Sequence, residues 1–359
     1  MAPERVAVAM SGGVDSSVAA ALLLTQGYDV VGLTMLVSPP EANGGVSDAS
    51  QAGAVADARR VASLLGIRHH LVDLRQDFQR AVIGPFCEEY ARGRTPNPCV
   101  LCNSYIKFGT LLQRARRLGA SRLATGHYAR VGRDEMTGRW VLRRGVDTAK
   151  DQSYTLFGLR QEQLARALFP LGEMRKAETR AEAVRLGLPV SQRPESQQIC
   201  FVSGRSYGDW LSRWRPEAAR PGPIVDPSGR QIGRHRGIAF YTVGQRHGLR
   251  VAGGKVLYVV GMDASRNQVV VGGEAELLAR GLVMREVNYV GLADLSAGGR
   301  KLRAKIRSAA RPAACLARPE GDGVVLQFPR RQRAVTPGQA AVCYDGEAVA
   351  LGGIIESAR

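Results

Sequence analysis

A glycine-rich turn near the N-terminus constrains the fold of this chain more than any other feature. An apolar run, Val6–Met10, leads into Ser11–Ser17 (Ser-Gly-Gly-Val-Asp-Ser-Ser), and an Ala/Leu-rich stretch, Val18–Leu24, continues toward Gly27. This order predicts a buried strand, a glycine turn and a helix that ends at Gly27. Because glycines allow close backbone approach and helix N-termini attract anions, the pattern predicts a phosphate-binding turn.

The chemistry of this turn is narrowed by what it lacks. It contains no lysine, so it is not the phosphate-binding loop of kinases and GTPases. Ser-Gly-Gly-Val-Asp-Ser resembles instead the pyrophosphate loop (PP-loop) of enzymes that split ATP between its α- and β-phosphates. That resemblance implies ATP as a ligand, and Asp15 as a residue that helps hold Mg²⁺ on the phosphates. The alternative is an ordinary Gly-Ser turn.

Strands and helices alternate over the first half of the chain. Strand-like and helical stretches follow one another at 29–37, 51–65, 68–74, 77–90, 105–118 and 122–127. Such alternation predicts an α/β fold with a doubly wound parallel sheet, whose ligands bind at the carboxyl ends of the strands. Met35, the Ser11–Ser17 turn and Gly126-His127 all lie at such ends. A further helical pattern covers 161–186.

The pattern changes at about residue 221, where short β-branched runs alternate with turn residues. Examples are Gln268–Val271 and Gly323–Phe328. Short strands at this spacing are typical of small β domains or a barrel. With 359 residues the chain is long enough for several cores. We therefore predict three domains, at 1–215, 216–280 and 281–359.

The charge balance favours a polyanionic partner. Fifty Lys and Arg against 32 Asp and Glu give a formal net charge of +18, and each phosphate neutralised by a cation releases counterions. Only six of the cations are lysines, so the arginine bias of a GC-rich genome is a competing explanation. No apolar run approaches the roughly 20 residues of a membrane span, and no secretory signal is recognisable. We expect a cytoplasmic protein without a membrane partner, with reduced cysteines.

Three of the six cysteines lie in polar, Gly- or Pro-rich surroundings. Thr95–Asn103 predicts a rigid loop that carries Cys99 and Cys102 as Cys-x-x-Cys, and Cys200 lies in a second such segment. No further Cys-x-x-Cys or His pair completes a four-ligand zinc site. Three cysteines could hold an iron–sulfur cluster, and a thiolate pair could carry a sulfur atom. The remaining cysteines are expected in the core; they are Cys87, Cys315 and Cys343.

Seven motifs stand in the order found in the bacterial tRNA-specific 2-thiouridylases and span nearly the whole chain. They are Ser11–Ser17, Thr95–Asn103 with Ile106–Gly109, Ala124–Tyr128, Lys150–Tyr154, Pro194–Phe201, Tyr241–Arg246 and Pro337–Val342. Each motif is weak alone, but their shared order makes the resemblance specific. It implies a PP-loop domain of the adenine nucleotide alpha hydrolase type, a small central domain and a C-terminal β-barrel.

The resemblance also implies an activity. Members of this family use ATP to adenylate the C2 oxygen of the wobble uridine of tRNA and replace that oxygen by sulfur. Adenylation turns a poor leaving group into AMP, so that a sulfur nucleophile can attack C2. By the same resemblance Cys200 carries the sulfur as a persulfide, Cys102 is the nucleophile, and the spent pair ends as a disulfide that a reductant reopens. We expect both thiols to be partly thiolate, because their surroundings are net positive.

Position 99 leaves two mechanisms open. Some members of the family carry Asp here, whereas others carry Cys, as this chain does. Cys99, Cys102 and Cys200 could therefore hold a [4Fe–4S] cluster whose unique iron binds hydrosulfide. We favour the persulfide route, with a cysteine desulfurase or a sulfur-relay protein as the donor, and keep the cluster as the alternative.

Ligand-binding residues follow from the resemblance by position. The ATP-binding residues are expected to be Ala9, Met10, Ser11, Gly12, Gly13, Val14, Asp15, Ser16, Met35 and Gly126. The tRNA-binding residues are expected to be His127, Lys150, Asp151, Gln152, Arg307, Ser308 and Gln339. Met35 could instead belong to the core, and His127 could be structural.

A group of cations near residue 300 adds to the expected tRNA surface. Alternation along one predicted strand would place them on one face, spaced to follow a phosphate backbone; they are Arg300, Lys301, Arg303, Lys305 and Arg307. The family commonly has Arg-Tyr where this chain has Arg307-Ser308, so the aromatic ring that could stack on a base is absent.

Two other functions compete with tRNA thiolation. An ATP-dependent amidating synthetase would use the PP-loop, but it needs an ammonia source and no paired cysteines. An RNA-binding protein with a metal-stabilised Cys-x-x-Cys would explain the charge, but it needs no ATP turn. Cys102 and Cys200 argue against the first, and Ser11–Ser17 argues against the second.

Overall fold

Two compact units make up the computed structural model, which describes residues 2–38, 47–193, 199–202, 207–251 and 256–359. The first unit comprises Met1–Val82, Cys99–Ser203 and Glu347–Val349. The second comprises Ile83–Pro98, Gly204–Gly346 and Ala350–Arg359. The predicted domain limits at 215 and 281 stay predictions.

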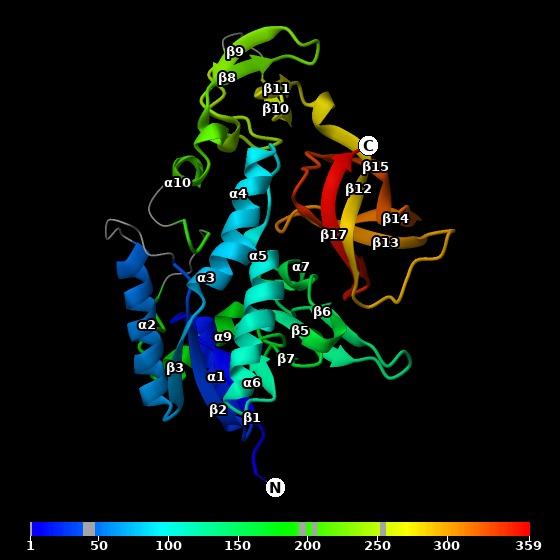
Figure 1. Cartoon of the computed structure of the whole chain (residues 1–359). Coiled ribbons are helices and arrows are strands. Elements are labelled where there is room, and N and C mark those ends of the chain that lie inside the picture. The colour runs from blue at the N-terminus through cyan, green and yellow to red at the C-terminus, as the bar shows by residue number, and fades with distance from the viewer. Residues whose placement is uncertain (1, 39–46, 194–198, 203–206, 252–255) are drawn as a thin grey trace. The chain divides into compact units, whose positions relative to one another are not determined.

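A five-stranded parallel sheet in the order β3-β2-β1-β4-β7 forms the centre of the first unit. Its strands are β1 (Arg5–Ala9), β2 (Asp29–Leu36), β3 (Arg68–Asp73), β4 (Arg122–Ala124) and β7 (Ala167–Leu168). The larger helices of this unit are α1 (Val14–Thr25), α2 (Ser47–Leu64) and α9 (Lys176–Arg185) (Figure 1). Apolar side chains from β1, α1, α2 and α9 share one core, so the predicted doubly wound α/β domain is confirmed.

Shorter elements complete the two units. The short helices are α3 (Arg75–Phe78), α4 (Gly84–Ala91), α5 (Pro98–Leu101), α6 (Leu112–Arg117), α7 (Ser153–Leu156), α8 (Gln161–Leu164) and α10 (Tyr207–Trp214). Gln79–Ile83 and Cys102–Leu111 are π-helical. An antiparallel hairpin of the first unit joins β5 (Ala129–Arg133) to β6 (Trp140–Arg144).

Two local predictions are wrong. Thr95–Asn103 is not a loop throughout, because a helix begins at Pro98 and continues through the π-helical segment into α6. Proline is favourable at the first residue of a helix, where its missing N–H would have no partner. Cys99 and Cys102 therefore lie on helical turns. The helical pattern at 161–186 contains β7, which has two residues and is too short to show a period.

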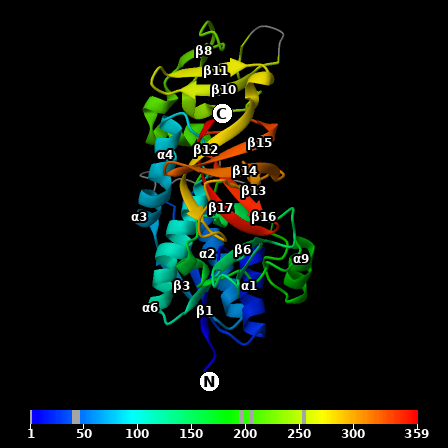
Figure 2. The ribbon, with the colours of Figure 1, turned by 90° about the vertical axis from the view of Figure 1, so that its right-hand side faces the viewer.

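The second unit contains two β structures, as the sequence predicts. A four-stranded sheet in the order β10-β11-β8-β9 consists of β8 (Gly222–Val225), β9 (Gln231–His235), β10 (Tyr258–Asp263) and β11 (Gln268–Gly272). The barrel strands are β12 (Leu278–Tyr289), β13 (Arg300–Lys305), β14 (Ala313–Glu320), β15 (Gly323–Arg333), β16 (Ala340–Asp345) and β17 (Ala348–Ala358) (Figure 2). The order β12-β15-β14-β13-β16-β17 closes into a ring because β17 also pairs with β12.

The cations of β13 do not share one exposed face. Lys301 and Arg303 are exposed, but Lys305 is buried, with only 6% of the residue exposed. Arg307 lies beyond the end of the strand. Alternate residues of a strand point the same way, yet their exposure depends on what packs over that part of the strand. The expected face of five cations is therefore wrong.

Candidate active site

The Ser11–Ser17 turn connects β1 to α1 and is held by its own serines. Ser16 Oγ accepts a hydrogen bond from the Ser11 backbone N–H (3.2 Å), and the Ser17 hydroxyl donates to the Gly13 carbonyl (2.8 Å). Gly13, the residue before α1, provides no side-chain cap. The N–H groups of the first helical turn therefore stay available to an anion, as the predicted phosphate-binding turn requires.

Two glycines allow the backbone to crowd around this turn. Gly12 has a φ of +71°, and a Cβ there would lie 2.3 Å from the Ala54 carbonyl oxygen. Gly126 follows β4, and a Cβ there would lie 2.7 Å from the backbone of Asp15 and Ser16. No side chain fits at either contact, because real Cβ atoms do not approach backbone atoms so closely. Gly126 thus brings the end of β4 against the first turn of α1.

The carboxyl ends of three neighbouring strands meet at this turn. The register pairs Ala9 with Leu33 and Val8 with Ala124, so the ends of β1, β2 and β4 lie at one edge of the sheet. Met35 is half-buried near the end of β2. The structure therefore brings the predicted ATP-binding residues together, with Met35 and Gly126 on either side of the turn.

Two cations contact the turn, and neither was predicted. Lys176 Nζ donates to Asp15 Oδ1 (2.7 Å), which also accepts a hydrogen bond from the Tyr128 hydroxyl (2.9 Å). Arg193 donates to the Gly12 carbonyl (2.8 Å) and forms an ion pair with Asp57. Lys176 was missed because it begins a helix with no motif of its own, and Arg193 because it stands alone.

The three candidate cysteines lie close enough to influence one another. Cys99 and Cys200 are exposed, and Cys102 is partly exposed. The protein packed around these thiols raises the pKa of Cys99 and Cys102, and raises that of Cys200 to about 12. The neighbouring Cys102 and Cys99 add to the rise at Cys200. Water at the exposed Cys200 moderates this effect.

These directions overturn the expectation of partly ionised thiols. Lys107 lies near all three sulfurs and lowers their pKa values, but it only partly offsets burial. A net positive charge over the whole chain does not decide the field at one sulfur. The three cysteines expected in the core are buried, as predicted. Pro194–Gln198, which precedes Cys200 in its motif, lies outside the described residues.

His127 connects the end of β4 with the helix that runs from Pro98 to Arg117 and carries Cys99 and Cys102 (the cysteine helix). Its ring lies 3.4 Å from Lys107 Nζ through Nε2 and 2.6 Å from Thr125 Oγ1 through Nδ1. Because an ammonium only donates, Nε2 accepts and the proton resides on Nδ1. Burial, with Lys107 adding to it, holds the pKa of His127 well below its usual value. The imidazole is therefore neutral near pH 7.

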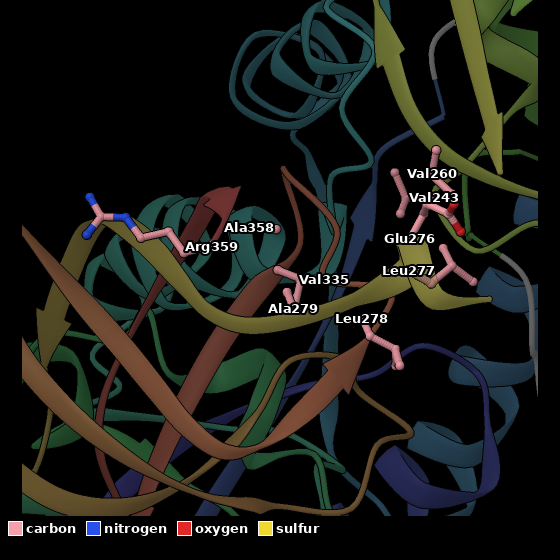
Figure 3. Close-up of a pocket in the computed structure, with 9 residues that line it drawn as sticks. All are labelled: Val243, Val260, Glu276, Leu277, Leu278, Ala279, Val335, Ala358 and Arg359. Atoms are coloured by element: carbon pink, nitrogen blue, oxygen red, sulfur yellow. The ribbon is translucent and has the colours of Figure 1, made fainter. Parts of the chain in front are cut away.

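A separate cavity of about 200 Å³ lies in the second unit (Figure 3). Most of its lining residues are of apolar types, among them Val243, Leu277 and Val335, and Glu276 provides a carboxylate. Arg359 turns its guanidinium away from the other lining residues, toward its ion-pair partner Glu320. This cavity gathers no set of catalytic groups, so the candidate active site stays in the first unit.

Comparison with known proteins places this geometry in a family. Residues 4–204, 208–273 and 279–355 match families described as a tRNA methyl transferase HUP domain, a tRNA methyl transferase PRC-barrel domain and an aminomethyltransferase beta-barrel domain. The tRNA-specific 2-thiouridylase MnmA of Heliobacterium modesticaldum is 49% identical over 98% of this chain and 92% of its own length. The chain belongs to the tRNA-specific 2-thiouridylase family.

Other relatives agree along their full lengths. The 2-thiouridylases of Symbiobacterium thermophilum and Moorella thermoacetica are 47% and 48% identical and cover 99% and 98% of this chain, and 93% and 99% of their own lengths. The methyl transferase wording belongs to the domain descriptions, whereas these full-length relatives carry the thiouridylase name. A solved 4-thiouridine synthetase–RNA complex aligns at a TM-score of 0.37 with 19% identity, over 60% of this chain and 51% of that one, which is too weak to inform the site.

The segment that would contact tRNA in the first unit has an internal role as well. The Asp151 side chain is 0% exposed and accepts hydrogen bonds from the backbone N–H of Gly145 and Ser153. Gln152 and Tyr128 bond each other twice, through Gln152 Oε1 and through their main chains. His127 is also buried. Asp151, Gln152 and His127 therefore shape this surface, and Lys150 is the partly exposed cation beside them.

The predicted tRNA-binding residues of the second unit also include both exposed residues and residues that bind within their own unit. Arg307 donates to the Val243 carbonyl (2.8 Å) and to Thr336 Oγ1 (2.6 Å). Ser308 is exposed. Gln339 Nε2 donates to the Thr95 carbonyl (2.8 Å), and Thr95 N–H donates to the Pro337 carbonyl. Arg307 and Gln339 therefore hold the main chain of their own unit, and Gln339 does so just before the cysteine helix.

Among the residues that the structure describes, no three His, Cys, Asp or Glu side chains gather as a metal-ligand set. Within the same described ranges, no helix is long and apolar enough to cross a membrane.

A methyl group at Gly126 should disrupt the site. Gly126→Ala would push β4 away from the backbone of Asp15 and Ser16, so we expect ATP binding to weaken about tenfold or more, ~1.4 kcal/mol. Titration calorimetry with Mg-ATP measures this. Gly53→Ala is the matched control, because a Cβ there meets nothing within 4 Å. An unchanged affinity in Gly126→Ala would contradict the proposed role of this contact.

His127 should make the folded state sensitive to acid. Its folded pKa lies below the unfolded value of 6.5, so below about pH 6.5 the unfolded chain binds a proton that the folded chain resists. The stabilisation is present above that pH and is lost as the pH falls toward the folded pKa. His127→Gln should therefore show a smaller drop in melting temperature from pH 7.5 to 5.5 than the wild type. His70→Gln, at an exposed histidine, is the control, and equal drops in wild type and His127→Gln would refute the assignment.

Proposed function

We propose that this protein is an ATP-dependent tRNA sulfurtransferase that converts the wobble uridine of tRNA to 2-thiouridine. The observation that carries the proposal is the presence of two features in one compact unit. These are an uncapped phosphate-type turn and three thiols that lie near a common cation, Lys107. The turn serves to activate an oxygen, and the thiols serve to replace it by sulfur. Amidation and simple RNA binding each use only one of these features.

The first half of the proposed reaction is adenylation. The Ala9–Ser16 backbone binds the triphosphate through the N–H groups of the first turn of α1, and Met35 and Gly126 flank the adenine and ribose. The uridine C2 oxygen attacks the α-phosphorus, the bond from that phosphorus to the bridging oxygen breaks, and pyrophosphate leaves with the electron pair. The N3 proton of the uridine is released, which leaves a neutral adenylated base.

Magnesium fits the donor set of this turn. The hydrogen bonds from Tyr128 and Lys176 to Asp15 reach Oδ1, and this carboxylate could coordinate a cation together with phosphate oxygens. Bound there, Mg²⁺ would neutralise charge on the phosphates. Ser11 and Ser16 provide hydroxyl oxygens in the same turn.

The second half of the proposed reaction transfers sulfur. A donor protein, either a cysteine desulfurase or a relay protein, loads the outer sulfur on Cys200 as a persulfide. That sulfur forms a bond to C2 as AMP departs with the electron pair of the C2–O bond. Cys102 attacks Cys200 Sγ, the S–S bond to the transferred sulfur breaks, and 2-thiouridine leaves. The two electrons that reduce this sulfur come from Cys102 and Cys200, which end as a disulfide that an external thiol reopens.

A [4Fe–4S] cluster on Cys99, Cys102 and Cys200 is the alternative sulfur carrier. Thiolates suit such a cluster, and the three residues lie near one another. In the described residues they are not already arranged as a ligand set. We favour the persulfide route and keep the cluster as its alternative.

The proposed tRNA-binding residues of each unit either contact tRNA directly or support those that do. Lys150 and Ser308 are accessible enough to contact the phosphate backbone directly. The remaining predicted residues require a local rearrangement or act by shaping the surface; they are His127, Asp151, Gln152, Arg307 and Gln339. We further propose a cytoplasmic location and the domain division 1–215, 216–280 and 281–359, which the three matched ranges support.

Loss of the Cys200 thiol should separate the two halves of the reaction. Cys200→Ser should reduce thiolation of transcript tRNA to background, because no persulfide can form, and should leave ATP and tRNA affinities within about twofold of wild type. Thiouridine is measured by mass spectrometry of digested tRNA. Cys87→Ser is the control for loss of a buried thiol outside the site. Normal thiolation by Cys200→Ser would defeat the persulfide assignment.

Position 99 distinguishes the two sulfur carriers. If a persulfide carries the sulfur, Cys99→Ala should keep thiolation within about tenfold of wild type, because Cys99 takes part in no bond that forms or breaks. The wild-type protein, purified without oxygen, should then contain no stoichiometric iron or sulfide. Stoichiometric iron in the wild type together with complete inactivity of Cys99→Ala would replace the persulfide route by the cluster route.

A further inference from the structure

An ammonium group lies against the phosphate-type turn and has no role in the reaction described so far. Lys176 is the first residue of α9, and its side chain is only 11% exposed. Its Nζ donates to Asp15 Oδ1 over 2.7 Å and lies 5.7 Å from the centre of the Tyr128 ring. The side chain therefore reaches from α9 to the first turn of α1.

The start of α9 is held firmly in place. Lys176 N–H donates to Asp147 Oδ2 (2.9 Å), and Arg175 N–H donates to Glu178 Oε2 (2.6 Å). One turn further, Thr179 Oγ1 lies 3.0 Å from the Tyr128 hydroxyl. Two carboxylates thus bind two backbone N–H groups at the start of this helix, and Lys176 extends from a backbone that they hold.

A contribution to the stability of the folded protein does not by itself explain why Lys176 pairs with Asp15. Removing an ammonium from water is unfavourable, and a well-packed apolar pair is often as stable as a partly buried ion pair. The Asp15 partner is 33% exposed, so water can compete for it. The pair nevertheless places a cation beside the N–H groups where the triphosphate is proposed to bind. A phosphate oxygen would be a stronger partner for it than a carboxylate shared with Tyr128.

We propose that Lys176 is a phosphate-binding residue whose ammonium exchanges Asp15 for the β- and γ-phosphates when Mg-ATP binds. This inference rests on the proposed function and adds a residue to it. Asp15 would then hold Mg²⁺, and Lys176 would contact the pyrophosphate group that leaves. As the bond from the α-phosphorus to the bridging oxygen breaks, the electron pair moves onto pyrophosphate, and the ammonium stabilises that charge. No proton transfer is required of Lys176.

Arg193 plays a different part. Its guanidinium is bound to the Gly12 carbonyl and to Asp57, so it holds the turn to α2. Lys176 instead donates to a carboxylate that would coordinate Mg²⁺. When the nucleotide binds, its ammonium could therefore donate to a phosphate oxygen. This is why the inference concerns Lys176 alone.

Binding of inorganic pyrophosphate and of AMP tests the inference on the full-length chain without tRNA. Lys176→Met should weaken Mg-pyrophosphate binding about tenfold or more and change AMP binding less than about twofold, because AMP lacks the groups that Lys176 contacts. Lys176→Arg should recover part of the loss by keeping the cation. Arg175→Met, which removes a neighbouring exposed cation on the same turn, should stay within twofold for both ligands.

The outcomes separate this inference from the proposed function. Equal pyrophosphate affinities in wild type and Lys176→Met would overturn the inference and leave the function standing. Equal weakening for pyrophosphate and AMP would also overturn it, because that indicates a damaged turn. If Lys176→Met fails to fold, Asp15→Asn/Lys176→Met removes both charges of the pair, and the same comparison is made against Asp15→Asn. Absence of both pyrophosphate and ATP binding in the wild type would defeat both proposals.

Discussion

The contact between Gly126 and the backbone of Asp15 and Ser16 is the constraint on which the site depends. It brings the end of β4 against the first turn of α1 without an intervening side chain. His127 and Tyr128 follow Gly126 directly, so the same contact positions a buried imidazole and the hydroxyl that binds Asp15. One close approach of two backbones therefore positions the Ser11–Ser17 turn beside His127, whose ring contacts Lys107 near the thiols.

The protein and the charges around the thiols set their ionisation. The protein packed around the sulfurs raises the pKa of Cys99, Cys102 and Cys200, so the resting thiols are protonated. Thiols react slowly with oxidants when protonated, since the thiolate is the nucleophile. Lys107 is the nearby cation that favours ionisation, and its contact with neutral His127 leaves its charge uncompensated by that residue. The ionisation of these thiols therefore depends on the charge of Lys107.

Some elements of the structure could be predicted from the local sequence, and others could not. The strand, turn and helix around Ser11–Ser17 were predictable because each has a strong local signal. The helix at Cys99 was not, because two nearby prolines indicate a loop until one of them starts a helix. The burial of Lys305 and the inward hydrogen bonds of Arg307 depend on chain segments far away in sequence. No periodicity along β13 records those segments.

The sequence by itself determined the α/β order, the barrel strands, the phosphate-type turn and the identity of the cysteines, because these depend on residue types close together along the chain. Only the tertiary structure decided which groups meet at the turn. Lys176 and Tyr128 reach Asp15 through packing of α9 against α1 and β4. It also decided the protonation of the thiols, because a pKa depends on the water and charge around a sulfur and not on the net charge of the chain.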